Sequence, residues 1–457
     1  MVSISPPQAL RARLPGLLGK AFGNTGTLMS TQLAMALLRF ASFPIILFFV
    51  DPADYGVMLA VGSLAVTLNF LSEMGLVPFT VRTEDGADPR SLDTVWTISV
   101  IRGVLIAAVM ALSAPLVADA FGDERIAPAL CIGALGSLLF ECRSLGPAVA
   151  QRQQNERKNA VIRLGTMAIG LVIQVALAYW LRDWRALAWG LVAQNGLIFV
   201  TSFLFYPQRH RILFDKAIAL ALWRFSRMIA ASSAVSLLVL QFDKYFVLAA
   251  ASMTVAGLFN TATNLVAVPE DLIHRHARGV FLPIVAERLR GGERGPQVFY
   301  EPLRLVRPLL VLICCGGVMA GPAAIEILLP TRYAGVGLFL SLLSLRAALN
   351  AVAEPQMAFL LADDGQRSIF YAQTGRLIWT VGVGTLGYAA YGITGLVLAV
   401  ALRELPPIII QSAALARRGV FSWRAEAPVA VAAAVGVALG ALAAAAGRAL
   451  DLSLFPA

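Results

Sequence analysis

The sequence predicts an all-α protein that crosses a membrane many times. Hydrophobic residues make up 58% of the 457-residue chain and charged residues only 14%, whereas a typical soluble domain has about 25% charged residues. The chain is divided into about a dozen apolar runs of roughly 20 residues, the helix length that spans the hydrocarbon core of a bilayer. Basic residues recur in every second loop between these runs, the pattern that orients membrane helices. We therefore expect a polytopic membrane protein of about 12–13 transmembrane helices.

The apolar runs place the individual spans. The expected spans are residues 27–50, 55–79, 93–118, 127–149, 161–181, 186–206, 226–250, 254–275, 303–328, 335–361, 369–390, 393–413 and 427–447. The first run is too long for a signal peptide and no small-residue cleavage site follows it, so we expect it to be retained. The last run is rich in alanine and weakly apolar, so it either spans the membrane or forms a peripheral helix.

The distribution of arginine and lysine sets the expected orientation. The loops on one side are strongly basic, whereas the loops on the other side hold only Arg125, Arg182, Arg185 and Arg332. Cytoplasmic loops of membrane proteins carry an excess of basic residues, so we expect a cytoplasmic N-terminus. The same bias accounts for the net charge of +10. No basic run is long enough for a nucleic-acid tail, so no nucleic-acid partner is expected.

A faint internal repeat predicts two similar halves. Residues 54–75 and 255–276 align through Gly56 and Gly257, and both segments run in the same direction in the expected topology. Parallel halves are one of the common plans of transporters. The expected domains are a six-helix bundle at 1–210, a second six-helix bundle at 211–415 and an extra C-terminal helix at 416–457.

Several spans carry ionisable residues near their middle. Arg39 lies halfway along the first span, and Lys244 and Arg346 lie inside two later spans. A charge at this depth costs about 2.5–3.5 kcal/mol on insertion scales. Three cations at similar depth exceed the acids that we expect at the same level. An excess of positive charge in a hydrated cavity favours an anion, and the guanidinium fork suits phosphate oxygens.

Polar residues around these cations complete the expected site. Arg346, Asn350 and Glu354 follow an i, i+4, i+8 spacing, which stacks them on one helix face. Asn260 and Asn264 repeat the i, i+4 spacing on another span, and the three amides are expected to bind the polar part of a substrate.

Two acids are candidates for ion coupling. They are Asp243, inside a span, and Glu354. Asp243 and Lys244 are neighbours whose side chains point about 100° apart on a helix, so each needs a different partner.

Enzymatic chemistry and bound cofactors are not expected. The loops contain no nucleophile elbow, phosphate-cradling glycine loop or paired-carboxylate motif, and none is large enough to house an active site outside the membrane. His274 and His276 flank Arg275, whose charge would repel a metal ion. We expect neither a metal site nor a cofactor.

The pattern resembles a known family. A D-x-x-D-Y-G element at 51–56, the sequence LSEMGL at 71–76, a basic loop between the fourth and fifth spans, and Asp243 before a glycine-bearing span are similar to Wzx-type oligosaccharide flippases. Their superfamily (MOP) also contains the MATE drug exporters and the lipid II flippases.

The resemblance implies a fold and a cargo. The fold would be two six-helix bundles in a V around a central cavity, in a bacterial inner membrane. The cargo would be an undecaprenyl-pyrophosphate-linked oligosaccharide, moved to the outer leaflet during exopolysaccharide or O-antigen assembly. Membrane lipids and the polysaccharide polymerase machinery are the implied partners. No site residue is carried over from the family.

Three alternatives remain. A cation-coupled drug exporter of the same fold would need an acidic cavity, yet the first span holds Arg39 and no acid before Asp51. A membrane polysaccharide polymerase or ligase would need a sizeable outer loop, which this chain lacks. A lipid II flippase differs mainly in its cargo.

Overall fold

The computed structural model describes residues 31–449 apart from 32–33, 36, 73 and 154. Every secondary-structure element in this part of the chain is a helix, as predicted. In chain order the helices are α2 (Pro52–Leu71), α3 (Leu76–Arg82), η1 (Glu84–Ala87), α4 (Pro89–Phe121), α5 (Ile126–Glu141), α6 (Gly146–Arg152), α7 (Glu156–Leu181), α8 (Trp184–Leu204), α9 (Lys216–Ala250), α10 (Met253–His276), η2 (Ala277–Phe281), α11 (Leu282–Arg290), α12 (Pro296–Tyr300), α13 (Val306–Leu328), η3 (Thr331–Tyr333), α14 (Val336–Ala362), α15 (Gln366–Ile378), η4 (Trp379–Val383), α16 (Gly384–Ala401), α17 (Leu405–Arg417) and α18 (Trp423–Ala449). Part of the expected span at 27–50 lies outside the described residues, and the rest of it contains the apolar helix Leu37–Phe49.

The chain forms two compact units. Unit 1 comprises Met1–Phe49, Leu64–Val117 and Glu124–Ser233. Unit 2 comprises Val50–Ser63, Ala118–Asp123 and Ala234–Ala457. The first three turns of α2 and only the last turn of α4 therefore belong with the second half of the chain, and α9 passes from one unit into the other.

Many of the helices can span a membrane. Eight helices among the described residues are long and apolar enough, or nine if the bent pair α5 and α6 is one span. One of the eight, Gln366–Arg417, covers both of the spans predicted at 369–390 and 393–413. The helix is broken at Tyr391 and Gly392, between the two predicted spans. The predicted span at 254–275 corresponds to α10, which is not among the eight helices. Its asparagines and Glu270 make it less apolar than they are.

The break inside Gln366–Arg417 is a sharp reversal. Gly392 has φ 62°, a conformation that glycine adopts without strain. Gly387 and Gly395 face each other so closely that a Cβ on Gly395 would lie 2.0 Å from the Gly387 carbonyl oxygen. As a result, α15 packs along α17.

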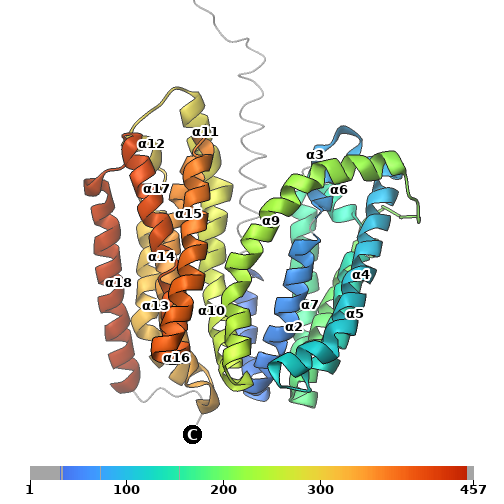
Figure 1. The fold of residues 1–457 in the computed structure, drawn as a ribbon, viewed down its shortest axis with the longest axis horizontal. Coiled ribbons are helices and arrows are strands. Elements are labelled where there is room, and N and C mark those ends of the chain that lie inside the picture. Colours follow the sequence, from blue (N-terminus) through green and yellow to red (C-terminus); the bar gives the residue numbers. More distant parts are fainter. Residues whose placement is uncertain (1–30, 32–33, 36, 73, 154, 450–457) are drawn as a thin grey trace, which may run out of the picture. The chain divides into compact units, whose positions relative to one another are not determined.

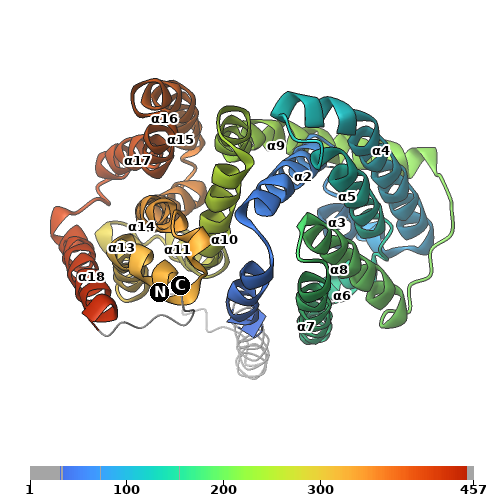
Figure 2. The ribbon, with the colours of Figure 1, turned by 90° about the horizontal axis from the view of Figure 1, so that it is seen from below.

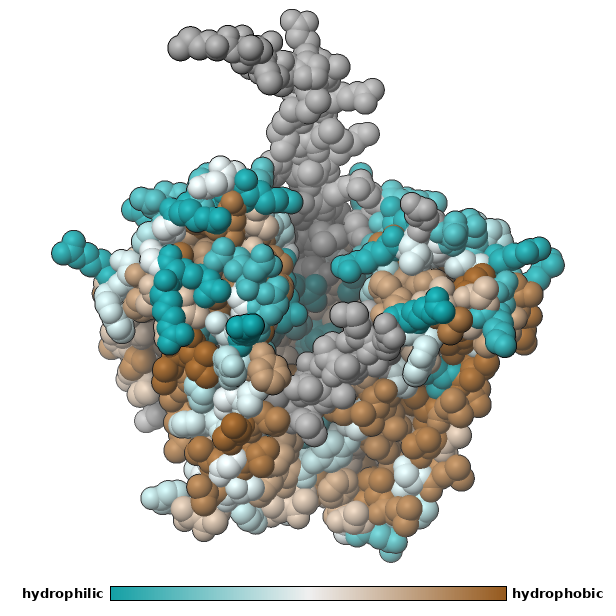
Figure 3. All heavy atoms as spheres, turned by 45° about the horizontal axis from the view of Figure 1, so that its top comes forward, coloured by the Kyte–Doolittle hydropathy of each residue, from teal (hydrophilic) through white to brown (hydrophobic). Residues whose placement is uncertain are grey.

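Apolar side chains cover the outer surface of both units. On the face in Figure 3, hydrophilic residues collect at one end of each unit, and hydrophobic residues form a band next to them. Leu112 and Leu116 on α4 and Val172 and Trp180 on α7 are among the most exposed large hydrophobic residues. Exposed apolar surface of this extent fits contact with lipid chains.

A buried histidine joins two segments of unit 1. His210, in the loop before α9, lies with its Nε2 3.1 Å from the Leu145 amide, which donates to it, and 3.0 Å from the Ser144 hydroxyl. Its Nδ1 faces Asp93 at 3.7 Å, and its ring stacks on Trp96. Burial lowers the pKa of His210, although the Asp93 carboxylate opposes this effect. The ring is therefore held neutral in the break between α5 and α6.

Helix α14 is the central element of unit 2. It packs against α10, α13, α16 and α17 (Figures 1 and 2), and most of its residues are buried. A helix so enclosed gives its polar side chains no water to bind, so they need partners inside the protein.

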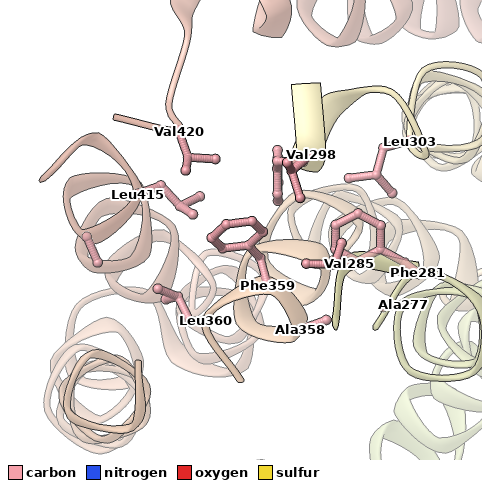
Figure 4. Packing of buried hydrophobic residues seen from close by; sticks show 12 residues of the cluster. Ala277, Phe281, Val285, Val298, Leu303, Ala358, Phe359, Leu360, Leu415 and Val420 are labelled. Carbon is pink, nitrogen blue, oxygen red and sulfur yellow. The ribbon is translucent and has the colours of Figure 1, made fainter. Parts of the chain in front are cut away.

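A hydrophobic cluster closes one end of unit 2 (Figure 4). Phe281 of η2, Val285 of α11 and Phe299 of α12 pack against Phe359 of α14. Leu415 of α17 extends the same cluster. The short helices α11 and α12 are thereby fixed on the ends of the long ones.

Helix α18 is docked on α13. A Cβ on Gly440 would lie 2.3 Å from the Gly316 carbonyl oxygen, so only glycine allows this approach. At the other end, Glu426 accepts hydrogen bonds from Arg307 at 2.8 and 3.0 Å and from the Tyr300 hydroxyl at 3.0 Å. Burial raises the pKa of Tyr300 to about 12, so its hydroxyl remains a donor at neutral pH. The alanine-rich last segment is one of the helices long and apolar enough to span a membrane.

Candidate functional site

Two packed helices of unit 2 carry matching rows of polar side chains. Residues four apart lie on the same face of a helix, and α10 packs against α14. We call the set of six residues the α10–α14 ladder: Glu270, His274 and Arg278 from α10 and η2, and Arg346, Asn350 and Glu354 from α14. The ionic contacts across it join residues in the same order on both helices, so the two rows run parallel.

The first rung joins Arg346 to Glu270. Arg346 Nε and Nη2 donate to the two carboxylate oxygens of Glu270 at 2.8 and 3.0 Å, and the Arg346 side chain is only 5% exposed. Arg346 Nη1 also lies 3.9 Å from Asp243. Arg346 therefore does not belong to the expected excess of cations over acids, because Glu270 on the neighbouring helix reaches it.

Asp243 is the centre of a second group of charges. Its Oδ2 lies 3.9 Å from Arg346 and 3.6 Å from Arg403. Arg403 also lies 3.5 Å from Glu404, and Glu404 pairs with Arg376. We call Asp243, Arg346, Arg403, Glu404 and Arg376 the Asp243 cluster. Guanidinium groups thus surround the acid that we expected to take part in ion coupling.

A break in a helix places Arg403 and Glu404 in this cluster. Residues 402–404 are not helical, and they separate α16 from α17. Pro406 and Pro407 follow in the first turn of α17. Proline has no backbone N–H to donate to the preceding turn, which explains why the helix is interrupted here.

Lys244 adds a positive charge beside the Asp243 cluster. The prediction that it does not pair with its neighbour is confirmed, since Asp243 instead faces Arg346 and Arg403. Only the backbone N–H of Lys244 donates to Asp243, at 3.0 Å. No carboxylate in the described part of the chain lies within 4.0 Å of the half-buried Lys244 ammonium group.

Arg39 is the predicted cation of unit 1. It lies in the helix that precedes α2 and is exposed. Within the described residues, no carboxylate forms an ion pair with its guanidinium group. Among the described residues, two of the three predicted cations, Arg39 and Lys244, thus have no carboxylate within ion-pair distance, although Asp243 and Glu270 act on the Lys244 charge from farther away.

The three predicted amides lie in different environments. Asn260 donates to the Tyr55 carbonyl oxygen at 3.1 Å and so braces α10 against α2. Asn264 is exposed and donates to the Asn260 side chain at 3.4 Å. Asn350 is buried in the α10–α14 ladder, where its Nδ2 lies 3.5 Å from His274 Nε2.

Glu354 closes the ladder and meets an exposed imidazole. Its Oε2 lies 3.2 Å from His274 Nδ1 and 3.7 Å from Arg278 Nε. The Glu354 side chain is 3% exposed and that of His274 is 43% exposed. Sequence reasoning did not assign roles to Glu270 and His274. The signal was the spacing of 270, 274 and 278, which mirrors 346, 350 and 354.

An arginine of unit 1 also has its polar partners on neighbouring helices. Arg102 on α4 donates to the Asn69 side chain at 2.8 Å and to the Ser72 hydroxyl at 3.0 Å. Its Nη1 lies 3.5 Å from the buried Glu141. This charge is held between helices and is not left over for an anion.

Comparison with known proteins supports the fold and a family. A family model described as a polysaccharide biosynthesis protein matches residues 46–338. The structure of the lipid II flippase MurJ in an inward closed conformation matches with a TM-score of 0.68 and 11% identity, covering 94% of this chain and 98% of that one. An inward-facing multidrug resistance MATE family transporter of the MOP superfamily gives a TM-score of 0.62 at 13% identity, covering 93% and 98%. No curated protein matches the sequence. The predicted all-helical fold class of MurJ and the MATE transporters is thus confirmed.

Proposed function

The chain belongs to the family of polysaccharide biosynthesis proteins, and from this premise we propose that it is a flippase for a lipid-linked oligosaccharide. The proposed cargo is an oligosaccharide on undecaprenyl pyrophosphate. It moves from the cytoplasmic to the outer leaflet of the bacterial inner membrane during exopolysaccharide or O-antigen assembly. The proposed orientation has the N-terminus in the cytoplasm, and the protein is a transporter and not an enzyme.

The observation that carries the proposal is the position of Lys244 beside a set of charges that pair with one another. The three acids Asp243, Glu270 and Glu404 are balanced by Arg346, Arg376 and Arg403. Lys244 stands beside this balanced set without a carboxylate among the described residues. A pyrophosphate cannot enter hydrocarbon without replacement of its hydration, and an ammonium group offers three donors to its oxygens. Arg39, in unit 1, is also proposed to bind the anionic cargo.

Arg346 is proposed to reach the head group by exchanging partners. The fork that holds both oxygens of Glu270 has the geometry that also holds two oxygens of a phosphate. A pyrophosphate that displaces Glu270 would therefore find the guanidinium already oriented. Asn260, Asn264 and Asn350 are proposed to donate hydrogen bonds to the sugar or to phosphate oxygens as the cargo passes.

An acid of unit 2 is proposed to couple transport to an ion. Asp243 and Glu354 are the candidates. Asp243 lies between two guanidinium groups, whose charge does not change at any physiological pH. Glu354 instead contacts an imidazole, which can gain or lose a proton near neutral pH. The contacts favour Glu354.

Export by cells tests the proposed function. In a strain that lacks the gene, we expect lipid-linked oligosaccharide to accumulate in the inner membrane and surface polysaccharide to be lost. The native gene restores export, and variants Arg39→Ala, Lys244→Ala and Arg346→Ala restore it less well at equal protein levels. Export at the native rate by all three variants would overturn the cationic assignment. Normal export without the gene would overturn the cargo.

A further inference from the structure

We propose that His274 and Glu354 form a proton-binding site and that the proton bound there is the coupling ion of the flippase. The inference rests on the proposed function and names its ion. His274 lies with Arg275 and His276 in the basic last turn of α10, where its side chain is 43% exposed, whereas that of Glu354 is only 3% exposed. A proton can therefore reach the imidazole, while the carboxylate that stabilises it stays shielded from water.

The other buried ion pairs of unit 2 do not suit this role. Arg346 with Glu270, Arg403 with Asp243 and Arg376 with Glu404 each use a guanidinium group. Guanidinium groups do not deprotonate in proteins. Histidine changes its charge between about pH 5 and 8. Among these contacts, only that of His274 with Glu354 can exchange a proton under the conditions in which a cell maintains a proton gradient.

Charged and polar groups from four elements face the pair. From α14, Asn350 Nδ2 lies 3.5 Å from His274 Nε2. From η2, Arg278 Nε lies 3.7 Å from Glu354 Oε2. Arg376 of α15 also acts on the charge of Glu354, and Glu270 lies one turn before His274 on α10. Glu354 therefore keeps a cationic neighbour when His274 is neutral.

Protonation of His274 rearranges the contact with α14. The Asn350 amide N–H can donate to Nε2 only while this nitrogen carries a lone pair. A protonated Nε2 is a donor, so the Asn350 carboxamide must turn its oxygen toward it or move away. The α10–α14 ladder thus has a different hydrogen-bond pattern in its two protonation states.

The same helix connects the proton to the cargo site. His274 lies four residues after Glu270, which holds Arg346 at the first rung. The residues after His276 form the π-helix η2, and such turns are frequent at functional sites. A shift of α10 upon protonation would therefore move the carboxylate that competes with the pyrophosphate for Arg346.

Nuclear magnetic resonance can observe the proton directly. The chain has three histidines, so protein with isotope-labelled histidine in lipid nanodiscs gives few signals, and His274→Gln and His276→Gln assign them. We expect the His274 signal to titrate between pH 5 and 8. In Glu354→Gln its midpoint should move to lower pH by about one unit or more, because the carboxylate that stabilises the imidazolium is gone. A His274 signal that does not titrate would overturn the proposal, and so would a titration midpoint that is the same in native protein and in Glu354→Gln.

Proton movement in vesicles supplies the second test. Proteoliposomes contain a pH-sensitive dye, and the probe is undecaprenyl-pyrophosphate-linked N-acetylglucosamine with a fluorescent label. We expect probe flipping to be accompanied by a change of internal pH, which His274→Gln abolishes and the control His276→Gln retains. Flipping by the native protein without proton movement would overturn the inference and leave the proposed function intact. No flipping of the probe would overturn the proposed function, while the titration would still decide whether the pair binds a proton.

Discussion

The two carboxylate oxygens of Glu270 accept hydrogen bonds from Nε and Nη2 of Arg346 at 2.8 and 3.0 Å. Because of this contact, an arginine near the middle of a membrane helix cannot be taken as a free cation. A guanidinium group that faces such a carboxylate is stabilised by the protein itself. It becomes available to a substrate only if the carboxylate is displaced. Lys244 has no carboxylate within ion-pair distance among the described residues, so a substrate would not need to displace one.

Removal of the Glu270 charge should lower stability and raise the affinity for a pyrophosphate lipid. Glu270→Gln leaves the 5% exposed Arg346 with Asp243 alone, and breaking a buried ion pair costs about 3–5 kcal/mol. We expect a lower thermal unfolding midpoint in detergent and tighter binding of undecaprenyl pyrophosphate by native mass spectrometry.

Two further variants control for this result. Asp271→Asn changes the exposed neighbouring acid and should alter neither quantity. The double variant Glu270→Gln/Arg346→Gln should recover part of the lost stability, because no unpaired charge is left. Weaker lipid binding by Glu270→Gln would contradict the exchange of partners at Arg346.

Acid should destabilise unit 1 through His210. The pKa of His210 is lowered from its ordinary value of 6.5, so the folded state holds this ring neutral while the unfolded chain binds a proton below about pH 6.5. Stability from this group is therefore complete above pH 6.5 and is lost as the pH falls below it. Protonation also removes the acceptor of the Leu145 amide, at about 1–3 kcal/mol.

The difference between native protein and His210→Gln isolates this effect. We expect the native unfolding midpoint to fall more steeply than that of His210→Gln between pH 7 and 5, and the two curves to run parallel above pH 7. Parallel curves over the whole range would show that the ring is not held neutral.

The last helix should depend on one buried arginine. Arg307 is 2% exposed and is neutralised by Glu426 at the start of α18. Glu426→Ala leaves this charge without its partner, at a cost of about 3–5 kcal/mol. Limited proteolysis should then cut between α17 and α18 much faster. Asp183→Asn, which breaks the exposed pair with Arg185, should cost less than about 1 kcal/mol. Equal protection of α18 in native protein and Glu426→Ala would refute this anchoring.

Two glycine-to-alanine changes should have opposite effects on the stability of the protein. Gly440→Ala places a methyl group 2.3 Å from the Gly316 carbonyl oxygen, and overpacking of this kind costs about 1–3 kcal/mol. Gly62→Ala meets no atom within 4 Å and should stabilise α2 by up to about 1 kcal/mol, because alanine favours a helix. Thermal unfolding of both variants checks the signs, and a stabilised Gly440→Ala protein would rule out the close α13–α18 contact.

The sequence predicted the helices better than the contacts between them. The two spans around Tyr391 and Gly392 could be predicted because hydropathy and a glycine mark them locally. The pairing of Glu270 with Arg346 could not, because it depends on which face of α10 packs against α14. The spacing of each row could be read from the sequence. The opposite charges of the two rows predict contacts only once the helices are known to be parallel neighbours.

The predicted site residues show the same limit. The separation of Asp243 from Lys244 followed from helix geometry alone. The arginines that surround Asp243 come from α14 and from the break before α17, and no local pattern specifies their meeting. Arg403 and Glu404 could be read as charges inside a span, but not as partners of Asp243 and Arg376.

The most direct test of the account is flipping of a fluorescent undecaprenyl-pyrophosphate-linked N-acetylglucosamine by purified protein in proteoliposomes, measured with a membrane-impermeant quencher. We predict that native protein and the exposed-lysine control Lys216→Ala flip the lipid at the same rate. Lys244→Ala should lower the rate at least about tenfold, the equivalent of about 1.4 kcal/mol. An unchanged rate in Lys244→Ala would contradict the claim that this ammonium group receives the pyrophosphate.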